Sequence, residues 1–290
     1  MSNFVILTDS SADLGNDLVQ QLGISVVPLT FTMNDTNYRN YPDNRDMDPH
    51  AFYDKLRDGA TATTAAANMV DFSEVAEPYL KEGKDVLILA FSSGLSVTCR
   101  SAQLAAEELA EAYPNRKIYA VDTLCASLGQ GLLVWHAAQL QKAGKSIEEV
   151  RDWVEENKLH LCHWFTVNDL MHLKRGGRVS ATTALVGTML SIKPVMHVDN
   201  EGHLINMAKS RGRKASLLAL VDKMAETVTD PENQTVFISH GDCLEDAQFV
   251  ADEVKNRLGV KEVYLNYVGP VIGAHTGPGV VALFYMGKER

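Results

Sequence analysis

A single histidine lies in a short segment that is rich in glycine and proline. Six of the eleven residues from Gly269 to Gly279 are Gly or Pro, and His275 is among the others. Glycine permits backbone conformations closed to other residues, whereas proline removes conformational freedom and a backbone donor. The segment therefore predicts a fixed shape without a long helix or strand, in which a titratable imidazole suits a binding site. A tight connection with a chance histidine explains the same residues.

Hydroxyl-bearing residues follow two of the predicted strands. Ser92-Ser93-Gly94-Leu95-Ser96 comes directly after an apolar strand and opens a long predicted helix. Hydroxyls and free backbone N–H groups at a helix N-terminus bind anions, so this turn predicts an anion site at Ser93 and Gly94. Helix capping is the alternative, and it is our interpretation of most of Asp9–Asp13. Thr61–Asn68, with three threonines, is predicted to be a loop between two helices.

Two stretches of basic residues offer positive charge. Gly176 and Gly177 predict the C-cap of a helix, and Arg178 lies beyond it, where a guanidinium could engage a carboxylate. The second stretch is predicted to begin a helix, where cations oppose the helix dipole. That placement in an acidic protein favours an anionic ligand or an acidic partner over a solvated face. Its basic residues are Lys209, Arg211, Arg213 and Lys214.

Composition argues against several classes of function. The net charge of 27 − 37 = −10 argues against nucleic acid as the main ligand. The apolar runs are too short to span a bilayer, and Met1–Leu7 predicts a first strand rather than a signal peptide. The four cysteines form no Cys-x-x-Cys pair, which favours reduced thiols in a cytosolic protein over disulfides or a zinc site.

Several motifs that suggest catalysis or metal binding are incomplete. His160 and Cys162 share one face of a predicted strand while His163 points away, and no second cluster completes a metal site, so we expect none. Gly144-Lys145-Ser146 lacks the earlier glycine of a P-loop. The Gly-x-Ser-x-Gly pattern of a nucleophile elbow is absent around Ser93.

The order of predicted elements indicates an α/β fold with two domains. Strands alternate with helices in the first half, which predicts a three-layer α/β/α domain with a mostly parallel sheet over residues 1–157. Hairpins mix with helices in the second half, which predicts an α/β domain with a mixed sheet over residues 158–290. The predicted strands are 4–8, 25–32, 85–91, 117–121, 159–167, 193–198, 203–207, 235–240, 262–268 and 280–285. The predicted helices are 14–22, 52–57, 72–82, 96–113, 130–143, 168–173, 182–190, 214–228 and 247–258.

Taken together and in order, these motifs resemble the successive signatures of the DegV family. The matching segments are Thr8–Ala12, Ser92–Ser96, Leu173–Arg178 and Gly269–Gly279, so the resemblance covers nearly the whole chain. The family's carboxylate-binding Thr-Ser motif corresponds to Thr63-Thr64-Ala65. Ala65-Ala66-Ala67 stands where the family often has Ser-Gln-Pro, and Val97 and Cys99 replace a usual glycine and aromatic residue.

The resemblance implies a bacterial, cytoplasmic protein that binds a long-chain fatty acid in an interior tunnel. The carboxylate is expected near the domain junction, at Thr63, Thr64, Ser93, Gly94, Arg178 and His275. Some family members present this carboxylate to a separate kinase subunit, which supplies ATP and Mg and makes acyl phosphate. We therefore expect no cofactor of the chain's own, no catalytic residue, a kinase partner near the basic stretch, and transient membrane contact for lipid exchange.

Two other functions remain open from the sequence. A hydrolase would use Ser93 as nucleophile and His275 as base, with Asp9 or Asp122 to orient the imidazole. A small polar ligand is the third possibility, because the fold resembles the sugar-binding domain of dihydroxyacetone kinase. A small polar cavity in place of a long tunnel would favour that possibility.

Overall fold

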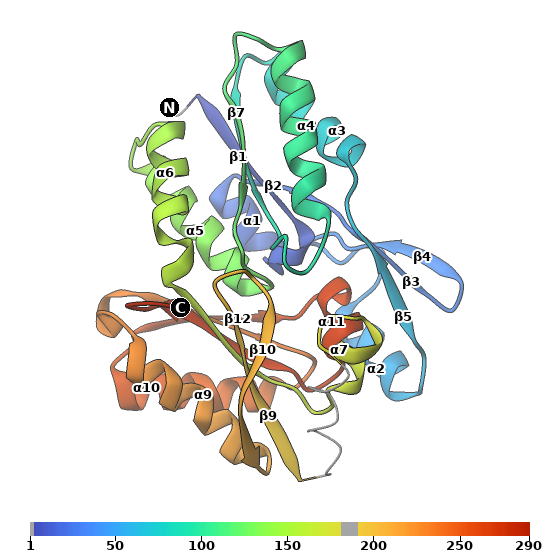
Figure 1. Cartoon of the computed structure of the whole chain (residues 1–290), viewed down its shortest axis with the longest axis vertical. Helices are drawn as coiled ribbons and strands as arrows, with labels where there is room; N and C mark the ends of the chain where they lie inside the picture. Colours follow the sequence, from blue (N-terminus) through green and yellow to red (C-terminus); the bar gives the residue numbers. More distant parts are fainter. Residues whose placement is uncertain (1–2, 181–190) are drawn as a thin grey trace.

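The computed structural model describes residues 3–180 and 191–290, which form a mixed α/β fold around three β-sheets (Figure 1). The first sheet is parallel, with strand order β2-β1-β6-β7. Its strands are β1 (Phe4–Asp9), β2 (Ser25–Val27), β6 (Asp85–Ala90) and β7 (Ile118–Asp122). The loops that follow the carboxyl ends of β1, β6 and β7 lie at one edge, where ligands gather in sheets of this kind.

Helices cover both faces of the parallel sheet. One face packs against α1 (Asn16–Leu22), α5 (Leu128–Lys142) and α6 (Ile147–Asn157), and the other against α3 (Met69–Lys81) and α4 (Thr98–Ala112). Phe4 and Ile6 of β1 belong to the cluster that contains α5, whereas Val5 and Leu7 belong to the cluster that contains α3 and α4. A strand buried on both faces must be apolar throughout. The predicted three-layer arrangement is confirmed.

The second sheet is mixed, with strand order β10-β9-β8-β13-β11-β12. Its strands are β8 (Leu161–Thr166), β9 (Ile192–Val198), β10 (Leu204–Arg211), β11 (Thr235–His240), β12 (Glu262–Tyr267) and β13 (Val281–Met286). β11 and β12 run parallel, while the other neighbours are antiparallel. One face packs on α9 (Arg213–Thr227) and α10 (Leu244–Leu258), so the mixed α/β architecture is confirmed as well.

Helix α5 lies between the two large sheets. It contacts β1 and β6 on one side and β8, β11 and β13 on the other. Phe237 and Phe284 of the mixed sheet share one hydrophobic cluster with Leu132 and Leu133 of α5. The apolar core therefore continues between the two halves of the chain. The division into two domains between residues 157 and 158 stays a prediction.

A third, antiparallel sheet of strand order β4-β3-β5 was not predicted. It contains β3 (Thr30–Met33), β4 (Thr36–Arg39) and β5 (Ala62–Ala65), and α2 (Pro49–Arg57) lies between β4 and β5 in the chain. The single strand predicted for 25–32 is wrong, because Pro28 separates β2 from β3 and cannot donate to a ladder. The loop predicted for Thr61–Asn68 is wrong at Ala62–Ala65, although Asn68 caps α3. Its β-branched threonines pair with β3, and only long-range pairing makes them a strand.

Short helices complete the described chain. They are α7 (Met171–Arg175), α11 (Pro270–Thr276) and three 3₁₀ turns at Ser10–Ala12, Lys158–His160 and Pro231–Asn233. The glycine- and proline-rich segment thus forms a seven-residue helix, with Gly269 at its N-cap and Pro270 at its first position. Helix α6 was missed, although Ser146 and Glu149 form a capping box at its start. The helix predicted for 182–190 lies outside the described residues. No helix in the described ranges has the length and hydropathy needed to cross a bilayer.

Candidate functional site

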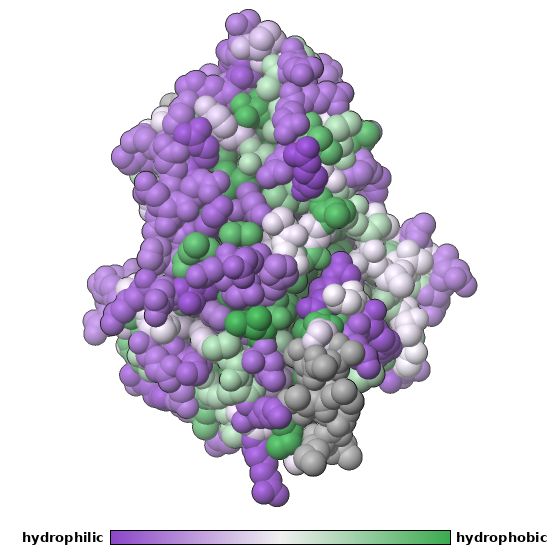
Figure 2. All heavy atoms as spheres, in the orientation of Figure 1, coloured by the Kyte–Doolittle hydropathy of each residue, from purple (hydrophilic) through white to green (hydrophobic). Residues whose placement is uncertain are grey.

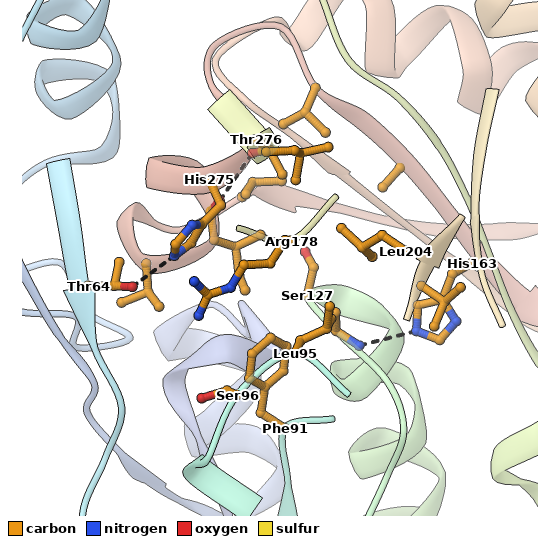
Figure 3. A pocket seen from close by; sticks show the side chains of 18 of the residues that line it. Thr64, Phe91, Leu95, Ser96, Ser127, His163, Arg178, Leu204, His275 and Thr276 are labelled. Carbon is orange, nitrogen blue, oxygen red and sulfur yellow. Dashed lines mark hydrogen bonds between the residues drawn. The ribbon is translucent and has the colours of Figure 1, made fainter. Parts of the chain in front are cut away.

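A cavity of about 470 Å³ lies where the two large sheets meet. Its walls come from the loops that follow β6 and β7, from β5 and α11, and from the face of the mixed sheet (Figure 3). Most of the lining is apolar, including Phe91, Leu95, Phe165, Val271, Ile272 and Phe284. An apolar wall of this extent favours an acyl chain over a small polar ligand.

Hydrophobic residues also reach the surface near the cavity. Figure 2 shows hydrophobic patches in the middle of one face, among hydrophilic side chains. Val97, which lines the cavity, is 71% exposed. The apolar lining therefore continues to the outside at the turn after β6.

The polar end of the cavity is formed by three side chains from separate elements. Thr64 of β5 and His275 of α11 lie 2.8 Å apart, from Thr64 Oγ1 to His275 Nε2, and Arg178 is beside them (Figure 3). Burial, and then the positive charge of Arg178, lowers the pKa of His275 to about 4. The ring is neutral at pH 7 and keeps one nitrogen as a donor. We call Thr64, Arg178 and His275 the polar trio.

Arg178 carries a charge without an acidic partner. Within residues 3–180 and 191–290 no carboxylate pairs with it, and its Nη1 donates to the carbonyl of Gly176. Burial lowers its pKa from the ordinary value of arginine. A half-buried guanidinium that lacks a counter-charge is stabilised by an anion, and a carboxylate matches its paired donors.

Gly176 makes room for the histidine. A Cβ at this position would lie 2.1 Å from His275 Nδ1, which is buried and has no hydrogen-bond partner among the described residues. Gly176 closes α7, as its predicted C-cap role requires, but it has a helical backbone that any residue can adopt. Gly177 beside it has a φ of +73° and supplies the left-handed turn. The two glycines thus serve different purposes.

The glycines of α11 allow the helix to approach the first half of the chain closely. A Cβ at Gly273 would lie 2.6 Å from the hydroxyl oxygen of Tyr53, whose O–H donates to Val268 O at 2.8 Å. Asp13 accepts from the N–H of Gly269 at 3.0 Å. Tyr53 and Asp13 are buried and are hydrogen-bonded to Val268 and Gly269, directly before α11. These bonds fix the start of the helix, and the helix therefore holds His275 in a fixed direction.

Sequence reasoning assigned Asp13 to a helix cap and missed its pairing with Ser127. The Ser127 hydroxyl donates to Asp13 Oδ2 at 2.5 Å and lies 3.0 Å from the hydroxyl of Ser239. Ser127 and Ser239 both line the cavity. Burial raises the pKa of Asp13 to about 7. The signal available in the sequence was the Asp-x-x-x-Asp spacing after β1, which also fits capping.

A second cavity of about 450 Å³ lies on the other side of the polar trio. It is lined by all three residues of the trio and by Thr63, His172, Arg175 and Gly176. The trio therefore lies between a mostly apolar cavity and one with a more polar lining, which adds Thr61, Thr63 and Arg175.

The structure places the other predicted head-group residues near the trio but in different surroundings. Ser93 lines the apolar cavity, and Thr63 lines the second one. Gly94 packs against the β9–β10 turn, because a Cβ there would lie 2.6 Å from Glu201 O. Its N–H donates to Ser92 Oγ at 3.2 Å, and that of Ser93 donates to Asp122 Oδ1. The prediction of free N–H groups at a helix start is wrong here, since α4 begins only at Thr98.

The contacts needed for a serine hydrolase are not formed among the described residues. His275 bonds to Thr64, and no hydrogen bond joins it to Ser93. Asp9 accepts from the N–H groups of Ser11 and Phe91, at 3.0 and 2.8 Å. Asp122 accepts from Ser93 and Leu124. Both acids considered for orienting the imidazole are therefore engaged elsewhere.

The basic stretch lies partly on a strand. Lys209 and Arg211 belong to β10, while Arg213 and Lys214 begin α9, so the prediction that all four open a helix is wrong. β10 pairs with β9 through Arg211, which delays the helix. Arg213 forms an ion pair with Asp246 at 2.8 Å. Lys209, Arg211 and Lys214 have no acidic partner among the described residues.

Residues suited to metal binding have other partners. His160 Nδ1 lies 2.8 Å from Lys288 O, and Cys162 Sγ lies 3.2 Å from Glu289 O. Two exposed groups bring three such side chains together in the described chain, namely His50, Asp54 and Asp242, and Asp199, Glu201 and His203. Arg57 neutralises the first group, with Nη1 2.6 Å from Asp242.

Comparisons with known proteins agree with this architecture. Residues 3–288 match the family model described as "Uncharacterised protein, DegV family". A DegV domain-containing protein of Clostridium perfringens is 48% identical over 290 residues, covering 100% of this chain and 99% of that protein. A structure described as showing fatty acid binding of a DegV family protein from Thermus thermophilus is 33% identical. It superposes with a TM-score of 0.87 and covers 98% of this chain and 99% of that one.

A second solved structure is that of DegV, described as a fatty acid binding protein from Bacillus subtilis. It is 28% identical, has a TM-score of 0.86, and covers 99% of this chain and 100% of that one. The family model spans nearly all of the sequence, and the identity to the C. perfringens protein extends over its whole length. The chain belongs to the DegV family.

Proposed function

We propose that this protein binds a long-chain fatty acid, with the acyl chain in the 470 Å³ cavity and the carboxylate at the polar trio. The observation that carries the proposal is the apolar cavity that ends at a buried imidazole, a hydroxyl and a guanidinium with no carboxylate partner among the described residues. Arg178 would donate to the carboxylate. Thr64 Oγ1 and His275 Nε2, which bond to each other in the free site, would exchange that bond for one bond each to the carboxylate. Ser93 and Thr63 flank this position on either side, and Gly94 holds the turn that carries Ser93.

Burial of the acyl chain supplies the affinity in this proposal. At about 0.8 kcal/mol for each buried methylene, a chain of ~16 carbons contributes roughly 10 kcal/mol before the cost of association. The carboxylate needs replacement hydrogen bonds when it leaves water, and the polar trio offers them. The relatives from T. thermophilus and B. subtilis, both described as fatty acid binding, support the same ligand class.

We further propose that the protein presents the carboxylate to a separate kinase subunit. Phosphoryl transfer needs access to a carboxylate oxygen from outside the acyl cavity, and the second cavity offers that access. Lys209, Arg211 and Lys214 offer positive charge to an acidic partner or to nucleotide phosphates. ATP and Mg would be bound by the partner, which acts in the cytoplasm. Exchange of the acid would take place during transient contact with a membrane.

Native mass spectrometry of the protein, purified and then stripped of lipid, tests the proposal. We expect the wild type to take up one palmitate or oleate per chain. His275→Ala and Arg178→Gln are expected to bind about tenfold more weakly, because each removes one hydrogen bond to the carboxylate. His50→Ala is the matched control, because His50 is exposed on α2 and lines neither cavity. Absence of bound lipid, together with no uptake of added fatty acid, would exclude this function.

A further inference from the structure

Three segments of the chain, at residues 124–125, 158–161 and 199, meet at one guanidinium. Arg290 Nε donates to Leu161 O at 3.0 Å, and Nη1 donates to Leu124 O at 2.7 Å and Asp199 O at 3.1 Å. Nη2 donates to Lys158 O at 2.5 Å and lies 3.2 Å from Cys125 Sγ. Arginine has five N–H donors in a fixed fork, and all five have an acceptor here. No other residue type offers this number of donors in one plane.

The backbone that carries Arg290 is itself fixed. The N–H of Gly287 donates to His160 O at 2.7 Å, and that of Lys288 donates to Thr227 O at 2.9 Å. Cys162 Sγ donates to Glu289 O at 3.2 Å. These contacts fix the guanidinium at the start of β8. The guanidinium in turn binds the loop after β7 and the turn that begins at Asp199.

Three of the acceptors, Leu124, Cys125 and Asp199, belong to loops whose neighbouring residues line the acyl cavity. Leu124 and Cys125 directly precede Ala126 and Ser127, which line the cavity. Leu124 and Ser127 each have a φ of +52°, a conformation that costs energy in residues other than glycine and persists only when its surroundings enforce it. The Arg290 bonds to Leu124 O and Cys125 Sγ are contacts that enforce it.

Asp199 begins the turn between β9 and β10, which packs beside Leu124 at Gly202. Val198 and Leu204 flank this turn, and both line the cavity. The turn meets the first half of the chain again at Ser92, whose hydroxyl donates to Gly202 O at 2.9 Å. Arg290 thus joins the loop after β7 to the β9–β10 turn, and these are two walls that would have to part for an acyl chain to leave sideways.

We infer that Arg290 is a positioning residue that holds these two cavity walls together and thereby slows the release of the bound acid. This inference rests on the proposed fatty acid function. It assigns Arg290 no contact with the ligand, so it predicts a change in the rates of binding and release that is larger than the change in affinity. A lysine has three donors on a flexible stem and can replace only part of the cluster.

Stopped-flow displacement of cis-parinaric acid by excess oleate tests the inference on the full-length protein. We expect release at least tenfold faster from Arg290→Ala than from wild type, with an intermediate rate for Arg290→Lys. Arg257→Ala is the control, because Arg257 pairs with exposed Asp222 on α9, at 2.6 Å. Hydrogen exchange is expected to quicken at residues 123–127 and 199–203, and to stay unchanged in α10.

The possible results separate the inference from the function on which it rests. If the wild type does not bind cis-parinaric acid, both fail. If the wild type binds and the Arg290 variants release the acid at the wild-type rate, only the inference fails, even when their thermal stability is lower. If Arg290→Ala does not fold, the comparison between Arg290→Lys and wild type decides in the same way.

Discussion

Replacing Gly176 with alanine is expected to weaken fatty acid binding by moving His275. The new Cβ would lie 2.1 Å from His275 Nδ1, whereas ordinary contacts begin at 3.4 Å, so the ring must move by about 1.3 Å. Such a shift breaks the bond of 2.8 Å between His275 Nε2 and Thr64 Oγ1. The moved ring also loses its hydrogen bond to the charged carboxylate, which is worth about 1.5 kcal/mol, so roughly a tenfold loss of affinity follows.

A double-mutant cycle measured by calorimetry with palmitate tests this reasoning. Gly176→Ala should lower the affinity in the wild-type background and have little effect in the His275→Ala background, because the clash is then gone. Gly177→Ala is the matched control. It strains a residue with a φ of +73° but has open space around the new Cβ, so it should reduce thermal stability without reducing affinity. Equal effects of Gly176→Ala in both backgrounds would refute the steric argument.

The remaining predictions concern titration and partner binding. A bound carboxylate should raise the pKa of His275 from about 4, and equal NMR titration midpoints with and without palmitate would contradict its place at the head group. Asp13 binds its proton more tightly when folded, so the wild type should lose stability as the pH rises from about 4 to about 7. The pKa change from 3.8 to about 7 limits this loss of folding free energy to about 4 kcal/mol. In chemical denaturation Asp13→Asn should remove the loss, and an unchanged pH dependence of its stability would count against the assignment to Asp13. Reversing Lys209, Arg211 and Lys214 to glutamate should slow acyl phosphate formation with a kinase subunit while palmitate affinity stays unchanged, and an unaltered rate would remove this surface from the proposal.

Much of the architecture followed from local patterns in the sequence. The apolar run at Asp85–Ala90 and the amphipathic helices around it predicted a buried parallel strand correctly, because burial on both faces leaves a clear pattern. The third sheet did not follow, since Thr63 and Thr64 become a strand only by pairing with β3. Local sequence does not encode a pairing partner some thirty residues away, and the strand propensity of these residues did not predict one.

The candidate site shows the same division between local and long-range information. Thr64, Arg178 and His275 were selected by residue type and family resemblance, and the fold brings them to one place. The reason for Gly176 lies in a contact with a residue about a hundred positions away, so the sequence showed only a helix cap. The contacts of Asp13 with Ser127, and of Arg290 with several carbonyls, also arise only when distant segments meet.

A crystal structure of the protein loaded with palmitate tests the central claim most directly. The account predicts continuous density along the apolar cavity, with the carboxylate oxygens within hydrogen-bond distance of Thr64 Oγ1, His275 and Arg178. It also predicts that the second cavity reaches the carboxylate from the other side. A carboxylate at the far end of the cavity, near His163, would contradict the account, as would a loaded crystal whose cavity holds no acyl chain.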